Sequence, residues 1–294
     1  MSQTDPDSPT KLYDRLFDAS ATKNYNLSIR IQQDGLSFTV FSPALNKIIG
    51  LEEVKFSGYQ PKSHPLSIQL YTAHCSRFLK NHAWLNQPFG KVNLLYTVKE
   101  FTLVPDILFK DEMAADMLKM VHEPEPESII CKHLCRWAEA RIIFAIHQML
   151  YKTVNDFFPS ARISHHLSAF IETLIPGVRQ KGVSSAVFLN VRNGFSDFLA
   201  IKNNQLVFVN SFECHSPEDS VYFLLFVMEQ IQANPEQWPV YISGEVHEDD
   251  KLSQLVYRYV RYVHYLDAGE NGKMSFSLEG INKHRYVELL NPLL

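Results

Sequence analysis

The amino-acid sequence predicts an α/β protein built from two related halves, and three observations support this fold class. The chain has 294 residues, which is enough for two domains. Apolar residues make up 46% and charged residues 20%, as is ordinary for a protein with a buried core. The same order of elements, three strands and then a helix, is predicted twice. We therefore expect a loose lead-in at residues 1–25 and halves at 26–180 and 181–294.

The first half opens on a predicted three-stranded meander. Leu27, Ile29 and Ile31 alternate with polar residues, which is the period-2 pattern of a half-buried strand. Asp34-Gly35 favours a type I′ hairpin turn, in which both central residues have a positive φ. The two return strands are expected at residues 36–41 and 46–56, and a helix at 65–81.

Further strands and helices fill the rest of the first half, with strands inserted near residues 91–135. The lead-in holds at most one helical turn, at 11–19. Strands are expected at 92–98, 100–104, 128–135, 140–146 and 161–165, and helices at 111–122, 147–158 and 168–174. Residues 175–184 contain Pro176, Gly177 and Gly182, which predicts a linker between the halves.

The second half repeats the opening pattern. A strand at 186–191 meets a second predicted type I′ turn at Asn193-Gly194, and a third turn is expected at Asn203-Asn204. The first two turns lie 159 residues apart, which indicates duplication; two unrelated hairpins are the alternative. The remaining strands are expected at 195–201, 206–212, 240–243, 273–278 and 286–290, and a helix at 251–263.

One helix of the second half has a clear start. Ser216 can cap it, Pro217 suits its first position, and Glu218 and Asp219 favour the positive end of the helix dipole. Its body, residues 221–231, is apolar nearly all round, so we expect it to be buried on every side.

Charge and hydropathy exclude several classes of function. A net charge of −4 gives no basic footprint for nucleic acid. The longest apolar run, Val221–Met228, is far shorter than the roughly 20 residues of a membrane-spanning helix, so no membrane insertion is expected. The first ten residues are polar and resemble no signal peptide, and the four cysteines are scattered. These features predict a cytoplasmic protein.

Glycine is scarce in this chain. There are 11 glycines, none adjacent to another, and no G-x-G occurs. Phosphate-binding loops use glycine where backbone N–H groups approach the ligand closely. The composition therefore argues against an intact glycine-rich nucleotide site.

Two segments nevertheless resemble motifs of the actin-like ATPase superfamily, with its ribonuclease H-like duplicated halves. Leu189-Asn-Val-Arg-Asn-Gly-Phe-Ser-Asp197 is similar to the second phosphate hairpin, and Val240-Tyr-Ile-Ser-Gly-Glu245 to the adenosine motif. The resemblance implies two halves, each with a mixed sheet opening on a three-strand meander and flanked by helices, and ATP between them. The chain is also similar to an uncharacterised bacterial family, a domain of unknown function with this fold, and is identified as a member.

The resemblance implies a set of nucleotide-binding residues, if the site is retained: Asn190, Arg192, Asn193, Gly194, Ser196, Asp197, Ser243 and Gly244. Several positions depart from the pattern. Asn190 stands where an acid is expected, Arg192 and Asn193 replace small residues, and Glu245 replaces a second glycine. In the first hairpin, Ile29-Arg-Ile-Gln-Gln33 fills the place of Asp-x-Gly. Metal-assisted phosphoryl transfer depends on such acids, so the motif is degenerate.

Two functions from different classes remain open. The first is a scaffold or adaptor without ATP hydrolysis, with no cofactor and an unidentified protein partner. The alternative is an ATP-binding ATPase or kinase-like switch that uses ATP and Mg²⁺ in a divergent cleft. No catalytic residue can be assigned for either.

Two histidine-containing segments carry residue types that could serve chemistry. Cys131-Lys-His-Leu-Cys135 would place His133 and both thiols on one strand face, but no fourth zinc ligand is evident, so buried structural cysteines and no metal are expected. His165 and His166 would point to opposite faces of a strand, so no joint role is expected.

Overall fold

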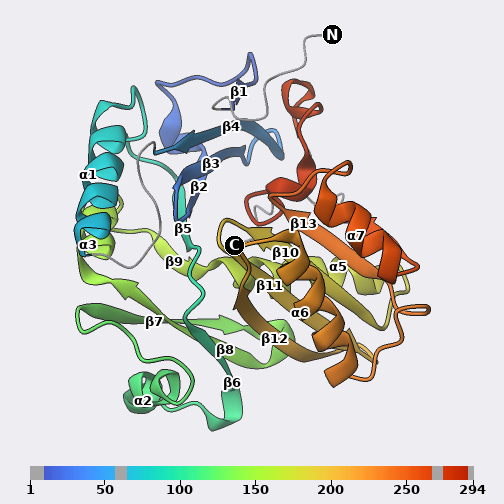
Figure 1. The fold of residues 1–294 in the computed structure, drawn as a ribbon. Coiled ribbons are helices and arrows are strands. Elements are labelled where there is room, and N and C mark those ends of the chain that lie inside the picture. Colours follow the sequence, from blue (N-terminus) through green and yellow to red (C-terminus); the bar gives the residue numbers. More distant parts are fainter. Residues whose placement is uncertain (1–9, 57–64, 267–273, 291–294) are drawn as a thin grey trace.

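The computed structural model describes residues 10–56, 65–266 and 274–290, and it contains two mixed sheets of matching topology (Figure 1). The first sheet has the order β1 (Lys11–Tyr13), β4 (Lys47–Lys55), β3 (Gly35–Ser42), β2 (Asn26–Ile31), β5 (Lys91–Tyr96) and β9 (Arg162–His165). The second has the order β12 (Gln205–Glu213), β11 (Phe195–Lys202), β10 (Ala186–Arg192), β13 (Val240–Gly244) and β14 (Val263–Tyr265).

Each sheet combines an antiparallel meander with a parallel pair of strands. Strands β2, β3 and β4 form the first meander, and β5 and β9 continue the sheet parallel to β2. Strands β10, β11 and β12 form the second meander, and β13 and β14 continue it parallel to β10. This confirms the α/β class and the meander that opens each half. Common descent of the halves stays a prediction.

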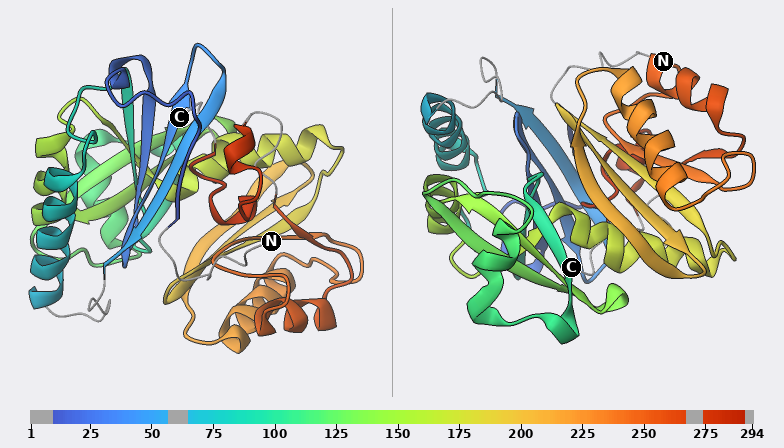
Figure 2. Two further views of the ribbon diagram at one scale, coloured as in Figure 1. Left: turned by 90° about the horizontal axis from the view of Figure 1, so that it is seen from above. Right: turned by 60° about the horizontal axis from the view of Figure 1, so that its bottom comes forward.

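Helices cover the outer faces of both sheets (Figures 1 and 2). On the first half these are α1 (Pro65–Asn81) and α3 (Gln148–Phe157), which pack against each other; on the second they are α6 (Pro217–Gln230) and α7 (Lys251–Tyr259). None of the helices in the described residues is both long and apolar enough to cross a lipid bilayer.

A linker was predicted at residues 175–184, but its first six residues are helical. Helix α4 (His166–Ala169), a π-helical stretch at Phe170–Leu174 and α5 (Ile175–Gln180) follow one another without a break. Pro176 lacks an N–H, and the helix widens directly before it. Ile175, Pro176 and Val178 are buried, so packing outweighs the local preference of proline and glycine for a loop.

A separate small sheet is inserted into the first half. It consists of β6 (Phe101–Pro105), β8 (Ala140–His147) and β7 (Ser128–Cys135) in that order, and α2 (Ala114–Lys119) packs against it. Strands were predicted to be inserted near residues 91–135. That boundary is wrong at both ends, because β5 belongs to the first main sheet and β8 extends the insertion to His147.

Neither of the first two hairpin turns has the predicted type I′ geometry. Gly194 has a φ of +82°, but Asn193 does not have a positive φ, and neither does Asp34 nor Gly35. A Cβ on Gly35 would lie 2.0 Å from the Val54 carbonyl oxygen, so close packing against β4 explains this glycine. The Asn203-Asn204 turn does have positive φ at both positions, of 51° and 65°.

The two ends of the described chain also differ from expectation. Strand β1 replaces the helical turn predicted at 11–19, and it pairs with β4. The strands predicted at 273–278 and 286–290 do not form. Phe276–Leu278 and Lys283–Arg285 are 3₁₀ turns, and residues 286–290 form a turn in which the Leu290 N–H donates to the Tyr286 carbonyl oxygen at 3.0 Å. Residue 273 lies outside the described residues.

Residues 274–290 pack between the halves, and we call them the C-terminal segment (Figure 2). Leu278, Tyr286 and Leu289 belong to a buried cluster with Ile48 and Leu51 of β4. The Ser275 N–H donates to the Ile48 carbonyl oxygen at 3.0 Å. Although the sequence places this segment in the second half, its apolar side chains pack on the first sheet.

Helix α6 begins as predicted but is not buried on every side. Ser216 Oγ accepts from the Asp219 N–H, and an Asp219 carboxylate oxygen accepts from the Ser216 N–H, which forms a capping box. Tyr222 is 64% exposed and Phe226 38% exposed, so one face of the helix meets solvent. The helix predicted at 251–263 ends at Tyr259.

Candidate functional site

The two hairpin turns that open the halves touch each other. Asn193 in the β10–β11 turn donates from Nδ2 to Asp34 Oδ2 in the β2–β3 turn, at 3.2 Å. The Gln33 Oε1 atom lies 3.8 Å from the position that a Cβ on Gly194 would take. Side chains of the first turn therefore directly face the second turn.

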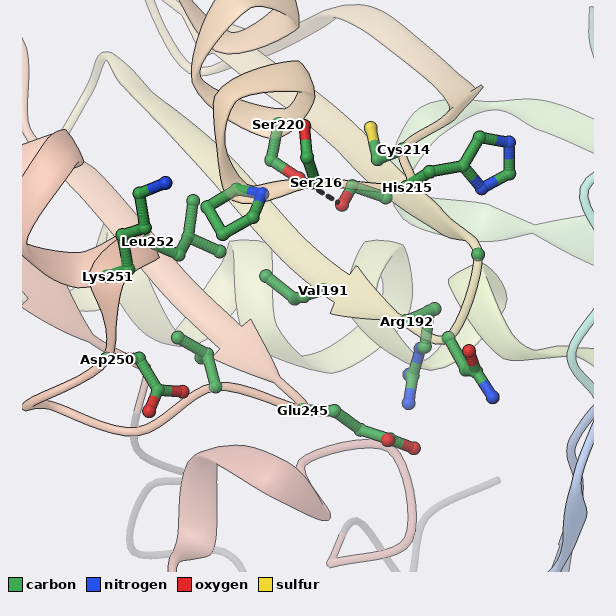
Figure 3. Close-up of a pocket in the computed structure, with 15 residues that line it drawn as sticks. Val191, Arg192, Cys214, His215, Ser216, Ser220, Glu245, Asp250, Lys251 and Leu252 are labelled. Carbon is green, nitrogen blue, oxygen red and sulfur yellow. Dashed lines mark hydrogen bonds between the residues drawn. The ribbon is translucent and has the colours of Figure 1, made fainter.

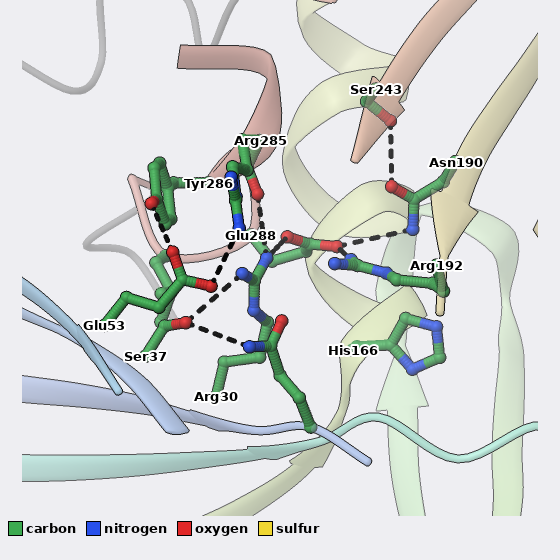
Figure 4. Close-up of polar contacts among 12 residues, drawn as sticks. Arg30, Ser37, Glu53, His166, Asn190, Arg192, Ser243, Arg285, Tyr286 and Glu288 are labelled. Carbon is green, nitrogen blue, oxygen red and sulfur yellow. Dashed lines mark hydrogen bonds and ion pairs between the residues drawn. The ribbon is translucent and has the colours of Figure 1, made fainter. Parts of the chain in front are cut away.

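Behind the turns, two arginines share one carboxylate (Figure 4). Arg30 of β2 donates from Nη1 to Glu288 Oε2 at 3.0 Å, and Arg192 of β10 forms an ion pair with Glu288 Oε1. The Arg30 and Glu288 side chains are fully buried and that of Arg192 is 2% exposed. Burial lowers the pKa of both arginines, that of Arg192 to about 9. Glu288 thus connects β2 and β10, the first strands of the two meanders.

A second buried carboxylate, Asp197 of β11, is also fully engaged. Its Oδ2 accepts from His166 Nε2 at 2.9 Å and from Asn190 Nδ2 at 2.8 Å, and its Oδ1 accepts from the Ser211 hydroxyl at 2.6 Å. Burial opposes ionisation of Asp197, but the His166 imidazole and the nearby Arg192 outweigh it and hold its pKa below the ordinary range. With Arg30 and Arg192, the two carboxylates form a balanced set of buried charges.

The structure brings most of the sequence-predicted residues together. Asn190, Arg192, Asp197 and Ser243 belong to one buried cluster, in which the Ser243 hydroxyl donates to Asn190 Oδ1 at 3.0 Å. Asn193 and Gly194 lie in the turn above it.

Two predicted residues have structural contacts that explain them without a ligand. The Ser196 hydroxyl lies 3.0 Å from that of Ser220 on α6. Gly244 has a φ of +88°, and a Cβ there would lie 2.1 Å from the Val191 carbonyl oxygen. A glycine is therefore required at position 244 by the close approach of β10 and β13.

Three members of the cluster were not predicted from the sequence: Arg30, His166 and Glu288. Arg30 had been noted only as a departure from the first phosphate hairpin. A signal was available for Glu288, which is a lone acid within the apolar run Tyr286–Leu290. Acids in such runs are seldom buried without a partner.

The expectation that His165 and His166 lie on opposite strand faces is wrong. Strand β9 ends at His165, and His166 begins α4, so the ring centroids lie only 4.4 Å apart. The roles of the two rings still differ. His165 Nε2 donates to the Val98 carbonyl oxygen at 2.9 Å, and burial lowers the His165 pKa well below its ordinary value. His166 instead faces Asp197.

An outer set of contacts fixes the C-terminal segment to the first sheet (Figure 4). Glu53 of β4 accepts from Arg285 Nη2 at 3.2 Å and from the Tyr286 hydroxyl at 2.6 Å. Burial raises the pKa of Glu53, but Arg285 and the Tyr286 hydrogen bond outweigh it and keep that pKa low. The Thr39 hydroxyl donates to the Leu289 carbonyl oxygen at 2.9 Å.

A cavity of about 480 Å³ opens beside the second hairpin (Figure 3). It is lined by the β10–β11 turn, the start of α6 and the loop that follows β13. Glu245 and Asp250 contribute carboxylates. The two cationic residues of the lining are already paired, Arg192 with Glu288 and Lys251 with Glu218. The N–H groups at the start of α6 are partly occupied by the capping box. The cavity therefore has the position, but not the charge, that a phosphate site requires.

The Cys131-Lys-His-Leu-Cys135 strand is packed rather than open. Burial raises the pKa of both thiols, that of Cys131 to about 12, and lowers the pKa of His133 to about 4. His133 Nδ1 lies 3.3 Å from the Ser164 hydroxyl of β9. Within residues 10–56, 65–266 and 274–290, no three His, Cys, Asp or Glu side chains gather in a way that would hold a metal ion.

Comparisons with known proteins agree with this architecture. The model of a family described as "Protein of unknown function (DUF3822)" matches residues 14–263. A Bacteroides thetaiotaomicron VPI-5482 protein with an actin-like ATPase fold and unknown function is 25% identical, with a TM-score of 0.74 over 85% of this chain and 93% of that one. A chain of a PilM–PilN type IV pilus biogenesis complex is 12% identical, with a TM-score of 0.57 over 90% and 96%. A search of curated proteins gave no match.

Proposed function

The chain belongs to the DUF3822 family of unknown function, has an actin-like ATPase fold, and on that basis we propose that it is an adaptor or scaffold that works without nucleotide. The observation that carries this proposal is the buried Arg30–Glu288–Arg192 cluster between the two halves. In an active member of this fold, ATP would lie there.

The residues at this place do not fit a magnesium nucleotide. Phosphates would have to pass between turns that are joined by the Asn193–Asp34 hydrogen bond. Both carboxylate oxygens of Asp197 accept hydrogen bonds from the protein, which leaves this acid poorly placed to serve a metal ion. The positive charges of Arg30 and Arg192 are balanced by Glu288 and Asp197. A polyanion would have to displace a carboxylate and the segment that carries it.

The fold itself is compatible with an adaptor. PilM has this fold and is described in a complex with PilN, so one protein of this architecture assembles with another protein. In our chain the cluster joins both sheets to the C-terminal segment, which favours a rigid body over an opening and closing cleft. Rigidity suits a protein that presents a fixed surface to a partner.

Nucleotide binding is tested by thermal unfolding and calorimetry with 1 mM Mg-ATP. We expect no heat of binding and no change in Tm. A site with a Kd of about 10 µM would be filled at about 100 times its Kd, which would add about 2.7 kcal/mol. At about 2 °C per kcal/mol for a chain of this size, Tm would rise by about 5 °C. Such a rise would overturn the proposal.

The second candidate is an ATP-binding switch, and the cavity beside the second hairpin is the observation that favours it. Gly194, Ser196 and Arg192 line this cavity together with Glu245. If the protein is an ATP-binding switch, Mg-ATP should raise its Tm, and a Gly194→Val variant should lose this rise. An exposed control, Gly280→Val, should leave it unchanged, because nothing lies within 4 Å of a Cβ at that position.

A further inference from the structure

Two sheet edges face each other across a groove that contains no residue of the buried cluster. Strand β12 is an edge strand of the second main sheet, and β6 is an edge strand of the inserted sheet. The two strands lie at adjoining edges (Figure 1), and the groove between them has a volume of about 320 Å³. It is lined by residues 101–103 of β6, residues 206–210 of β12 and Val121. Within the described residues, no backbone hydrogen bond joins the two strands.

An ion pair connects the two edges at one end of the groove. Lys99, two residues before β6, pairs with Glu213, the last residue of β12. The start of β6 therefore lies beside the end of β12, and the two strands run in opposite directions. The groove is thus bounded by a strand edge on each side and by an ion pair at one end.

The backbone of β12 has groups that point away from its own sheet. After one shift of register, the strand pairs with β11 in continuous antiparallel register from Phe208 to Glu213. The Ser211 N–H donates to Asn210 Oδ1 at 2.9 Å, so it points away from β11. Because the backbone groups of a strand alternate between its two edges, the Val209 N–H and C=O point the same way. Val209 lines the groove, and within the described residues no hydrogen bond outside the β11–β12 ladder involves these two groups.

The β12 edge is accessible. All nine residues of the strand are half-buried or exposed, whereas β11 beside it is buried except at Lys202. Within the lining, Val207 is 45% exposed. Proteins usually protect such unpaired edges with charged side chains, because the edges otherwise accept a further strand. None of the residues that line this groove is charged.

Aromatic side chains continue from this edge onto α6. The ring centroids of Phe208 and Phe212 lie 6.5 Å apart, and Phe212 stacks on Phe223 of α6 with centroids 4.3 Å apart. On the same helix, Tyr222 is 64% and Phe226 38% exposed. Partly exposed aromatic side chains are enriched at protein interfaces. A strand added to β12 would place every second side chain beside this aromatic face, so those side chains should be apolar.

We propose that an extended segment of a partner protein adds to β12 as a further strand in this groove. Its amides pair with the outward backbone groups of β12, and its side chains are uncharged, with apolar ones beside the aromatic face. The edge strand of a second copy would bring its whole sheet with it, and β6 blocks that approach. The proposal rests on the adaptor function, since it names the chemistry of the partner. Mg-ATP titration tests the cleft and peptide titration tests this groove, so either can fail alone.

The experiment measures binding of three fluorescein-labelled heptapeptides to the full chain by fluorescence polarisation. The first alternates Thr and Val, the second has the same sequence with two adjacent central amides N-methylated, and the third has Lys in place of the central Val. N-methylation keeps the side chains and the charge but removes amide donors from both edges of the peptide. We expect saturable binding of the first peptide, and binding of the other two that is weaker by at least about tenfold.

Variants of the protein test the place of binding. Val207→Lys puts a charge on the accessible edge, so the first peptide should bind about tenfold more weakly, with an unchanged Tm. The matched control, Leu45→Lys, adds the same charge in the first half at a residue 42% exposed, and should bind as the natural protein does. Val209→Pro removes the outward N–H without removing a bond to β11, and should also weaken binding.

Four results would overturn the proposal. The alternating peptide fails to bind, its N-methylated form binds equally well, or Val207→Lys and Leu45→Lys weaken binding to the same extent. The fourth is self-association of the natural protein, measured by sedimentation, that Val207→Lys abolishes, because the occupant would then be a second copy.

Discussion

Glu288→Gln is the substitution that most directly tests the role of the buried cluster. The change keeps the shape of the side chain but removes the charge that Arg30 and Arg192 share. Both guanidiniums are buried, so neither can recover solvation without opening the structure. Arg30 would retain the Arg285 carbonyl oxygen, 2.9 Å from its Nη1, and Arg192 would retain Asp197, 4.0 Å from its Nε.

These remaining contacts set the size of the effect. Removing one partner of a buried ion pair costs about 3–5 kcal/mol of unfolding free energy. Arg30 keeps a hydrogen-bond acceptor, Arg192 keeps an ion-pair partner, and Gln can still accept from one of the two arginines. We therefore expect the lower end, about 3 kcal/mol. That corresponds to a fall in Tm of about 6 °C for a chain of this size.

Urea and thermal unfolding measure this change, with Glu279→Gln as the control. Glu279 is an exposed residue of the same C-terminal segment, so its substitution should change stability by less than about 0.5 kcal/mol. In an Arg30→Met background, Glu288→Gln should cost at least about 1 kcal/mol less, because one of the uncompensated charges is gone. Two results would refute this reasoning. One is that Glu288→Gln and Glu279→Gln lower the free energy of unfolding equally, and the other is that Glu288→Gln costs as much in the Arg30→Met background as in the natural protein.

Three further substitutions have opposite or pH-dependent outcomes. Gly177→Ala should stabilise the protein by about 0.5–1 kcal/mol in urea unfolding, because Gly177 lies within α5 with open space around it. Gly244→Ala should destabilise it by at least about 2 kcal/mol in the same assay, since its Cβ would meet the Val191 carbonyl. The pKa of His133 falls from 6.5 to about 4 on folding, so the unfolded chain binds the extra proton between these values. Stability should therefore fall as pH drops from 6.5 to 4, by up to about 3 kcal/mol, and His133→Gln, but not the exposed His215→Gln, should remove this loss.

These strands and helix ends could be predicted from the sequence because they depend on residues close to one another in the chain. Alternation at Leu27, Ile29 and Ile31 predicted β2, and the paired Asn203-Asn204 turn predicted where β11 ends. Ser216 as the capping residue, followed by Pro217, predicted the start of α6 to the residue. In each case the groups that determine the structure lie within a few positions of one another.

The same local signals misled where tertiary packing outweighed them. Pro176 and Gly177 favour a loop, yet burial of Ile175 and Val178 keeps them helical. Gly35 was attributed to a left-handed turn, whereas the nearby β4 backbone is what excludes a side chain there. Residues 286–290 are apolar enough for a strand. However, they lie between the two main sheets and form no strand of either.

The candidate site was predicted in part. Asn190, Arg192, Asp197 and Ser243 do meet, because strand order in this fold places the ends of β10, β11 and β13 together. Their partners were missed because His166 is 31 residues from Asp197, and Glu288 is 258 residues from Arg30. No local pattern connects positions so far apart.

The sequence by itself determined the α/β class and the meander that opens each half. It also showed which residues depart from the motifs at the place where the resemblance puts a nucleotide. Only the tertiary structure decided what occupies that place. Alternation in β2 shows that its two faces differ, and it predicted a half-buried strand. It does not reveal what covers the polar face. That face is buried too, because the C-terminal segment brings Glu288 to Arg30, and a buried charge is stable only where a distant opposite charge reaches it.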